Sequence, residues 1–187
     1  PSNSYYAISL RARLKMCDAY NRQYGTNFIT TMPTNLYGPN DNFDLETSHV
    51  LPALLRKCHD AKTDQAKELV VWGSGTPRRE FLHADDLADA CVFLMQNCSA
   101  SELDGHVNIG TGVDVSIREL THLIQKTVDY KGALAFDASK PDGTPRKLLN
   151  VDKMNKLGWT AKKTLERGLQ ETYDWYLSNV NLPKDAS

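Results

Sequence analysis

The glycine turn Gly73-Ser74-Gly75 is flanked by residues of the types that bind nucleotides. Trp72 comes directly before the turn, and Arg78 and Arg79 follow it closely. An indole ring can stack on a base, and a guanidinium can donate paired hydrogen bonds to phosphate oxygens. The run therefore suits a nucleotide diphosphate, although a plain hairpin turn explains the same residues taken singly.

Two distant segments carry groups that suit the same ligand. Lys57 offers an ammonium group, and the polar loop at 137–147 contains Asp142, whose carboxylate can accept hydrogen bonds from sugar hydroxyls. Taken alone, the loop fits a solvated surface segment. Convergence of Lys57, Trp72, Arg79 and Asp142 on one cavity is what favours a nucleotide-sugar site.

Tyr6 and His49 are the candidates for proton transfer. A helical tyrosine with a lysine four residues later can donate a proton to a ketone, because the cation lies one turn away on the same face. Here the fourth residue is Leu10. Histidine exchanges protons readily near neutral pH, and His49 follows a Gly-, Pro- and Asn-rich loop. A lone tyrosine in a core and a lone histidine on a surface are also common.

Residues 33–39, Pro-Thr-Asn-Leu-Tyr-Gly-Pro, follow a short β-rich run at 28–32 and are expected to form a loop. Open α/β sheets bind ligands just beyond the carboxyl ends of their strands. The loop is therefore a candidate ligand-binding segment, and a simple turn is the alternative.

Composition excludes several classes of function. The 187 residues are 41% hydrophobic and 24% charged, and their formal net charge is −1, so no global field favours nucleic acid or membrane binding. No apolar run is long enough to span a bilayer. The four cysteines form no CxxC pair and no zinc-ligand spacing, so we expect no metal site, reduced thiols and a cytoplasmic location.

Helical and extended patterns alternate along the chain, which predicts an α/β fold with parallel strands. Asp85 is expected to cap the helix that follows Glu80–His83, and Ser116 with Glu119 forms a capping box. No GxGxxG motif stands between a strand and a helix, so the sequence carries no dinucleotide fingerprint. Helices are expected at 5–24, 48–61, 117–128, 152–157 and 165–177, and strands at 69–72, 107–109 and 134–136.

Five stretches occur together: PTNLYGP at 33–39, SHV at 48–50, VVWGSGTP at 70–77, REFLH at 79–83 and DASKPDGTPRKLL at 137–149. With this set the chain resembles the GDP-L-fucose synthase family of extended short-chain dehydrogenases/reductases, over residues 1 to about 180. The resemblance implies epimerisation of GDP-4-keto-6-deoxy-D-mannose at C3 and C5, followed by NADPH-dependent reduction at C4.

The resemblance also implies roles for individual residues. Tyr6 and His49 would be catalytic, and Lys57, Trp72, Arg79 and Asp142 would bind the GDP-sugar. The NADP(H) contacts would come from Pro33, Thr34, Asn35, Leu36 and His49.

The implied fold is the carboxy-terminal part of a Rossmann-type NAD(P)-binding fold plus a smaller α/β substrate-binding domain. Residues 1–47 would be a remnant of the dinucleotide-binding domain. Residues 48–187 would be mainly substrate-binding, with returns to the Rossmann sheet near 80–112. The helical opening is expected to lie inside a longer protein, which relatives suggest is a homodimer joined through the tyrosine helix.

Leu10 departs from the family pattern, because the family has lysine there. With no glycine fingerprint either, the chain by itself is expected neither to bind NADPH nor to turn over substrate. The alternative is a catalytically inactive truncated relative that keeps the nucleotide-sugar pocket or serves as an interaction module. A related GDP-sugar reductase with another substrate is a further alternative.

Overall fold

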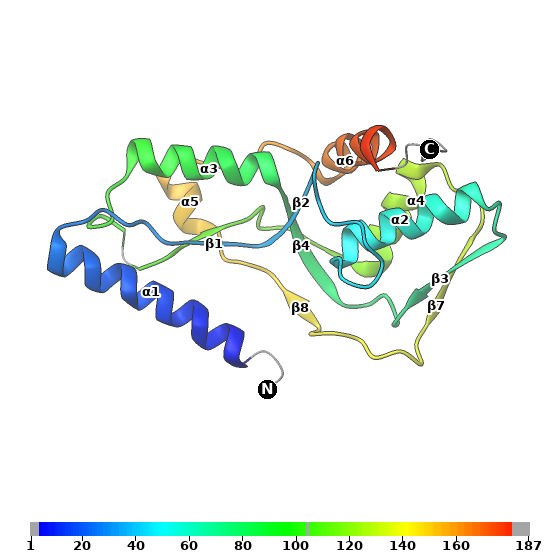
Figure 1. Ribbon diagram of the computed structural model, residues 1–187, viewed down its shortest axis with the longest axis horizontal. Coiled ribbons are helices and arrows are strands. Elements are labelled where there is room, and N and C mark those ends of the chain that lie inside the picture. Colours follow the sequence, from blue (N-terminus) through cyan, green and yellow to red (C-terminus); the bar gives the residue numbers. More distant parts are fainter. Residues whose placement is uncertain (1–3, 104, 181–187) are drawn as a thin grey trace, which may run out of the picture.

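A computed structural model describes residues 4–103 and 105–180 of the chain (Figure 1). Helices and strands alternate along it, as the sequence pattern predicts. In chain order the elements are α1 (Ser4–Tyr24), β1 (Thr31–Pro33), β2 (Asn35–Tyr37), α2 (Val50–Thr63), β3 (Glu68–Trp72), β4 (Arg78–His83), α3 (Ala84–Asn97), β5 (Val107–Ile109), β6 (Asp114–Ser116), α4 (Ile117–Val128), β7 (Ala133–Asp137), β8 (Arg146–Lys147), α5 (Asp152–Leu157) and α6 (Leu165–Asn179).

The described strands form three small sheets, in which parallel pairing predominates. β1 pairs with β5 and β3 with β7, both in parallel. β4 is the centre of the third sheet, since it pairs in parallel with β2 and β8 and antiparallel with β6. The α/β class with parallel strands is confirmed.

Two hydrophobic cores lie on either side of β4. The first joins α2, α4 and α6, and it contains Leu55, Ile124 and Leu169 with no exposed surface. The second joins α3, α5 and β5 through Leu94 and Met154. Figure 1 shows these helices at opposite ends of the molecule, with β2, β4 and β8 between them.

Helix ends mostly follow the local signals in the sequence. At the start of α4, Ser116 accepts a hydrogen bond from the Glu119 N–H, and the Glu119 carboxylate accepts one from the Ser116 N–H, so the predicted capping box is confirmed. α5 ends at Gly158, whose φ of 94° lies in the region that glycine adopts without strain.

The predicted cap of α3 was wrong. The capping residue is His83, whose Nδ1 accepts the Asp85 N–H at 3.2 Å. β4 extends to His83, so the helix begins at Ala84, one residue before Asp85. The Asp85 carboxylate binds the Lys163 ammonium at 2.9 Å instead.

The segment 33–39 is also more ordered than a loop. Residues 35–37 form strand β2, because they pair with Phe81, Leu82 and His83 of β4. Of the positions predicted to bind ligand, Pro33 ends β1, Asn35 and Leu36 belong to β2, and Thr34 joins the two strands. Pairing with β4 gives Asn35 and Leu36 a fixed register.

α1 lies at the edge of the molecule (Figure 1). It exposes several large apolar side chains. Tyr5, Ile8, Met16 and Tyr24 are each more than half exposed. Within the described ranges, no helix has the length and apolar character needed to cross a membrane.

Candidate active site

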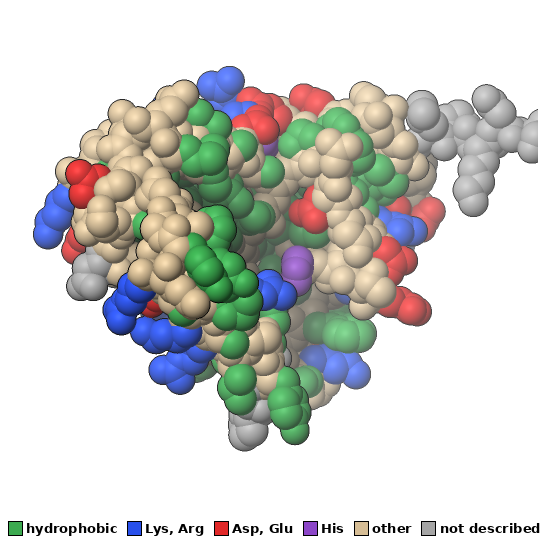
Figure 2. Space-filling model, turned by 60° about the vertical axis from the view of Figure 1, so that its left-hand side comes forward, with side chains coloured by type: hydrophobic (Ala, Val, Ile, Leu, Met, Phe, Trp, Pro, Cys, Tyr) green, Lys and Arg blue, Asp and Glu red, His purple; other side chains and the backbone are tan. Residues whose placement is uncertain are grey.

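A cavity of about 1200 Å³ lies between α1, the β1–β2 segment and the residues after β8. It brings together Tyr6, residues 33–36 and His49, which are far apart in the sequence. Figure 2, which turns the α1 end of the molecule forward, shows a hollowed surface bordered by hydrophobic side chains, with basic groups and a histidine near it. The cavity is lined by Tyr6, Leu10, Arg13, Leu14, Thr30, Thr31, Met32, Pro33, Thr34, Asn35, Leu36, Asp41, His49, Lys147, Leu148 and Leu149.

The backbone and side chains at 33–36 are held by two neighbouring strands. The Thr34 N–H donates to the Ile109 carbonyl at 3.0 Å. The Thr34 hydroxyl and the Asn35 amide both donate to the Glu80 carbonyl, at 3.2 and 2.8 Å. Three of the four residues are half-buried, and Asn35 is exposed. This wall of the cavity is thus a rigid strand edge.

Tyr6 and His49 reach the cavity from two helices. Tyr6 is 66% exposed on α1. His49 stands at the amino end of α2 with extended backbone, and its side chain makes no capping hydrogen bond. Both rings are consequently accessible to a molecule in the cavity.

Sequence reasoning missed Asp41, an acidic residue on the same cavity. Burial raises the pKa of its carboxyl group, while the hydrogen bond from the Asn42 N–H and the nearby charge of His49 act against this shift. Asp41 follows Asn40 in a loop of turn-forming residues, so its sequence context suggests only a turn. Its place beside a candidate acid/base residue is visible only in three dimensions.

The helix wall of the cavity contains Tyr6, Leu10, Arg13 and Leu14. Leu10 stands one turn from Tyr6 and brings no charge. Arg13 supplies a cation to the same wall. It lies about 10 Å from Tyr6 along the helix axis, at a rise of about 1.5 Å per residue. Arg13 was not predicted to line this site.

A second cavity, of about 180 Å³, lies between the ends of β3, β4 and the 141–143 segment. Trp72, Arg79 and Asp142, three residues predicted to bind substrate, all line it. Lys57 does not line this cavity, but its Nζ lies 5.1 Å from the centre of the Trp72 ring. The remaining lining residues are Val50, Gly75, Pro77, Ile117, Pro141 and Gly143.

The wall formed by Asp142 is held to the glycine turn. Its two carboxylate oxygens accept the Ser74 N–H at 3.0 Å and the Ser74 hydroxyl at 2.6 Å. A Cβ on Gly73 would lie 2.5 Å from Asp142 Oδ1, and the Gly73 φ is 88°. Glycine is therefore required at 73. Each carboxylate oxygen keeps a further lone pair for another donor.

Arg79 and Trp72 present the groups expected to bind a nucleotide. Arg79 Nη1 donates to the Arg78 carbonyl at 2.7 Å, and partial burial lowers the pKa of its guanidinium. The Trp72 ring is 68% exposed and faces two ammonium groups, those of Lys57 and of Lys140 at 5.5 Å. Sequence reasoning placed Lys140 in the binding loop without giving it a role.

Arg78 is fully engaged in the framework beneath this cavity. It donates to Asp114 at 2.8 Å and lies 3.3 Å from Glu119. Arg146 binds the other oxygen of Asp114. Hydrogen bonds from Arg146 and Arg78 lower the pKa of Asp114. These ion pairs fasten β4, β6 and β8 together and leave Arg79 as the guanidinium that faces the cavity.

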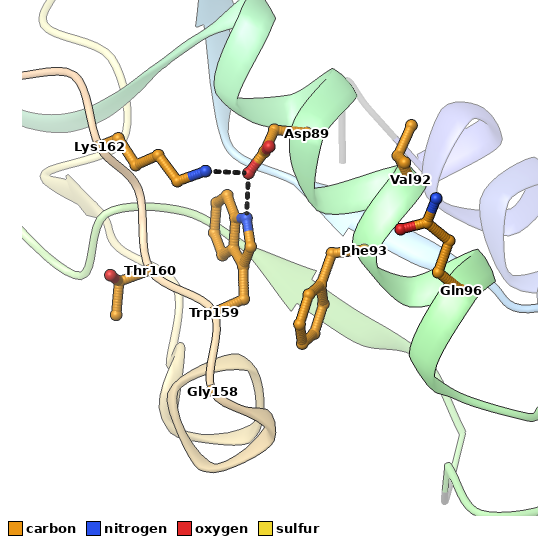
Figure 3. Close-up of a pocket in the computed structure, with 8 residues that line it drawn as sticks. All are labelled: Asp89, Val92, Phe93, Gln96, Gly158, Trp159, Thr160 and Lys162. Carbon is orange, nitrogen blue, oxygen red and sulfur yellow. Dashed lines mark hydrogen bonds and ion pairs between the residues drawn. The ribbon is translucent and has the colours of Figure 1, made fainter.

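Two other clusters lie away from these cavities. A shallow cavity of about 290 Å³ between α3 and the segment after α5 contains Asp89, which accepts the Trp159 indole N–H at 2.8 Å and the Lys162 ammonium at 3.0 Å (Figure 3). His83, Asp85 and Glu171 are close enough to share an ion, but the Lys163 ammonium already binds both carboxylates. No residue of either cluster was predicted to bind a ligand.

Comparison with known proteins identifies the family. The model of the "NAD dependent epimerase/dehydratase family" matches residues 1–110, more than half of the chain. The chain belongs to this family. The match includes α1 and the β1–β2 segment that line the larger cavity.

Relatives of known name agree with this assignment. GDP-L-fucose synthase 1 of Arabidopsis thaliana is 58% identical over 180 residues, which cover 96% of this chain and 55% of that protein. GDP-L-fucose synthase of Escherichia coli K12 is 54% identical, covering 96% of this chain and 58% of that protein. The solved GDP-L-fucose synthetase of Naegleria fowleri superimposes with a TM-score of 0.87 at 32% identity, covering 97% and 57%. The chain thus spans a little over half the length of these relatives.

Proposed function

We propose that this chain supplies the tyrosine helix and the substrate pocket of a GDP-L-fucose synthase. That enzyme epimerises GDP-4-keto-6-deoxy-D-mannose at C3 and C5 and reduces its C4 ketone with NADPH. The identity of 54–58% to proteins named GDP-L-fucose synthase supports the substrate.

The observation that carries the proposal is the shared cavity of Trp72, Arg79 and Asp142. A guanidinium binds a diphosphate through paired N–H donors, and an aromatic face takes up a base or sugar by stacking. Lys57 and Lys140 add positive charge beside the indole. Although the net charge of the chain is −1, these cationic side chains would give the cavity a local positive charge that favours an anionic GDP-sugar.

The larger cavity suits the reacting sugar and the nicotinamide end of the cofactor. NADPH, when bound, supplies the hydride that reduces the ketone carbon. Pro33, Thr34, Asn35 and Leu36 would line its nicotinamide side, together with His49. The 187 residues contain no glycine-rich phosphate turn, so they fit this end of the dinucleotide and not its diphosphate.

Tyr6 and His49 would move the protons in this cavity. The Tyr6 phenol would give its proton to the ketone oxygen as the C4 carbonyl becomes an alcohol. His49 would act as the second acid or base when the C–H bonds next to the ketone invert. A ketone acidifies both neighbouring C–H bonds, so the same groups can serve C3 and C5 in turn.

The proposal extends to the organisation of the protein. Residues 1–47 would belong to the dinucleotide-binding domain and 48–187 mainly to the substrate domain, and the pairing of β1 with β5 supports a return to the first sheet within 80–112. The exposed apolar side chains of α1 would form a homodimer interface. We place the enzyme in the cytoplasm.

Titration calorimetry with GDP tests the substrate pocket. The wild-type chain should bind GDP, and Arg79→Ala should weaken binding by about tenfold or more, since a charge-assisted hydrogen bond contributes about 1.5–3 kcal/mol. Arg167→Ala removes an exposed arginine of α6 that lines neither cavity, and it should leave the GDP affinity unchanged.

Binding and oxidation of NADPH are the second test. We expect no NADPH binding and no NADPH oxidation with the keto-sugar nucleotide, because the phosphate turn is absent and Leu10 replaces the family lysine. Equal loss of GDP affinity in both arginine variants, or no GDP binding by the wild type, would overturn the assignment of the pocket.

A further inference from the structure

Glu80 is a carboxylate buried in the middle of the molecule with 0% of its surface exposed. Its Oε1 accepts the backbone N–H groups of Thr111 at 2.6 Å and Gly112 at 2.7 Å. Its Oε2 accepts the Leu149 N–H at 2.9 Å. A buried charge is costly unless hydrogen bonds satisfy it, and here three backbone donors do so.

These bonds tie together segments that line both candidate cavities. Leu149 lines the larger cavity and lies two residues after the polar loop 137–147, which carries Asp142 of the smaller one. The Glu80 carbonyl also receives the hydrogen bonds from Thr34 and Asn35. Arg79, the neighbouring residue, lines the smaller cavity.

The absence of a side chain at Gly110 leaves the space that the Glu80 carboxylate occupies. A Cβ on Gly110 would lie 2.3 Å from Glu80 Oε1, so a larger residue at 110 would displace it. A carboxylate is acceptor-only, whereas the amide of glutamine would turn an NH₂ group toward backbone N–H donors. The site therefore discriminates between Glu and Gln although their shapes match.

We propose that Glu80 is a positioning residue that sets the Arg79–Asp142 cavity and the 33–36 wall in one fixed arrangement. The inference rests on the proposed function for the ligand and on the hydrogen bonds for the positioning. Glu80 itself lines neither candidate cavity. It acts through Leu149, the 111–112 turn and its own carbonyl group.

Asp86 offers a matched control for this role. It is 3% exposed, and its Oδ2 accepts two backbone N–H groups, those of Lys162 at 3.1 Å and Lys163 at 2.9 Å. It lines neither candidate cavity. Asp86→Asn removes the charge of the acceptor and so weakens bonds of the same kind, at a place away from the proposed site.

The experiment combines amide hydrogen exchange with GDP calorimetry on the 187-residue chain. Glu80→Gln should speed exchange at residues 111, 112 and 149 at least tenfold and weaken GDP binding by about tenfold, which corresponds to the loss of one charge-assisted bond. Asp86→Asn should speed exchange at 162 and 163 only and leave the GDP affinity within twofold of wild type. Gly110→Ala, which keeps the carboxylate but displaces it, should behave like Glu80→Gln.

The outcomes separate the two proposals. Unchanged exchange at 149 in folded Glu80→Gln overturns the positioning role, and so does equal weakening of GDP binding by Asp86→Asn. If Glu80→Gln does not fold, the Gly110→Ala measurement decides by the same criteria. If the wild type binds no GDP, the proposed function fails, while exchange at 111, 112 and 149 still decides whether Glu80 holds these segments.

Discussion

Gly168 on α6 is a glycine whose replacement by alanine should destabilise the protein, against the usual trend in helices. Alanine inside a helix is favoured over glycine by about 1 kcal/mol. Here the added Cβ would lie 2.1 Å from Tyr37 Oη, far inside an ordinary carbon–oxygen contact of about 3.3 Å. The Tyr37 ring is 3% exposed and is held edge-on by Phe81 and His83, so it has no space to move away.

Overpacking of a core costs about 1–3 kcal/mol, so an upper-range clash of about 3 kcal/mol outweighs the helix gain. We expect Gly168→Ala to lose about 2 kcal/mol, which lowers Tm by about 4–8 °C for a domain of this size. Thermal and urea unfolding followed by circular dichroism measure both quantities.

Tyr37→Phe provides the partner variant in a double-mutant cycle. Removing the hydroxyl leaves ring carbons at 2.9 and 3.0 Å as the nearest atoms to the new Cβ, so part of the clash disappears. Gly168→Ala should therefore cost about 1 kcal/mol less in the Tyr37→Phe background. A raised Tm for Gly168→Ala, or no coupling to Tyr37, would refute the argument that α6 packs against β2 at this point.

Two further predictions concern titratable groups in the interior. Burial, followed by the charge of Lys163, lowers the pKa of His83. The unfolded chain then binds more protons below about pH 6.5, so stability should fall from pH 7 to pH 5, and urea unfolding should show a smaller fall for His83→Phe. Equal falls in the two proteins would contradict this. Burial raises the pKa of the Cys58 thiol to about 12, and the residue is 1% exposed. A thiol reagent at pH 8 should therefore label Cys58 only after unfolding, and labelling at the rate of half-buried Cys17 would disprove it.

Local signals in the sequence predict elements whose ends are decided locally. The capping box at Ser116 and the stop at Gly158 act within one turn of helix, and both predictions are confirmed. The cap of α3 depends instead on how far β4 extends before the chain turns. That length is set by pairing with β2, a contact between residues more than forty positions apart, so Asp85 was chosen wrongly.

The candidate site likewise contains residues that the local sequence identifies and residues that it does not. Trp72, Arg79 and Asp142 are recognisable by side-chain chemistry, and the structure places them on one cavity. Their roles remain predictions. Glu80 and Asp41 were not predicted. Glu80 binds backbone amides and Asp41 lies near a histidine, but nothing in the local sequence distinguishes either residue from an ordinary surface acid.

Strand β4 explains why these two groups of residues depend on each other. Successive strand residues point to opposite faces, and Phe81 packs in the first core while Leu82 packs in the second. Arg79 shares the face of Phe81, and Glu80 shares the face of Leu82. The register with β2 and β6 fixes both assignments.

A slip of β4 by one residue would exchange the two faces. It would bring the Glu80 carboxylate toward the smaller cavity, where it would repel a diphosphate, and would bury the Arg79 guanidinium without a carboxylate partner. The buried pattern of Phe81 and Leu82 opposes that slip, since each would leave its own core. The burial of Phe81 and Leu82 in opposite cores is thus the same feature that presents the guanidinium to the ligand and keeps the carboxylate away from it.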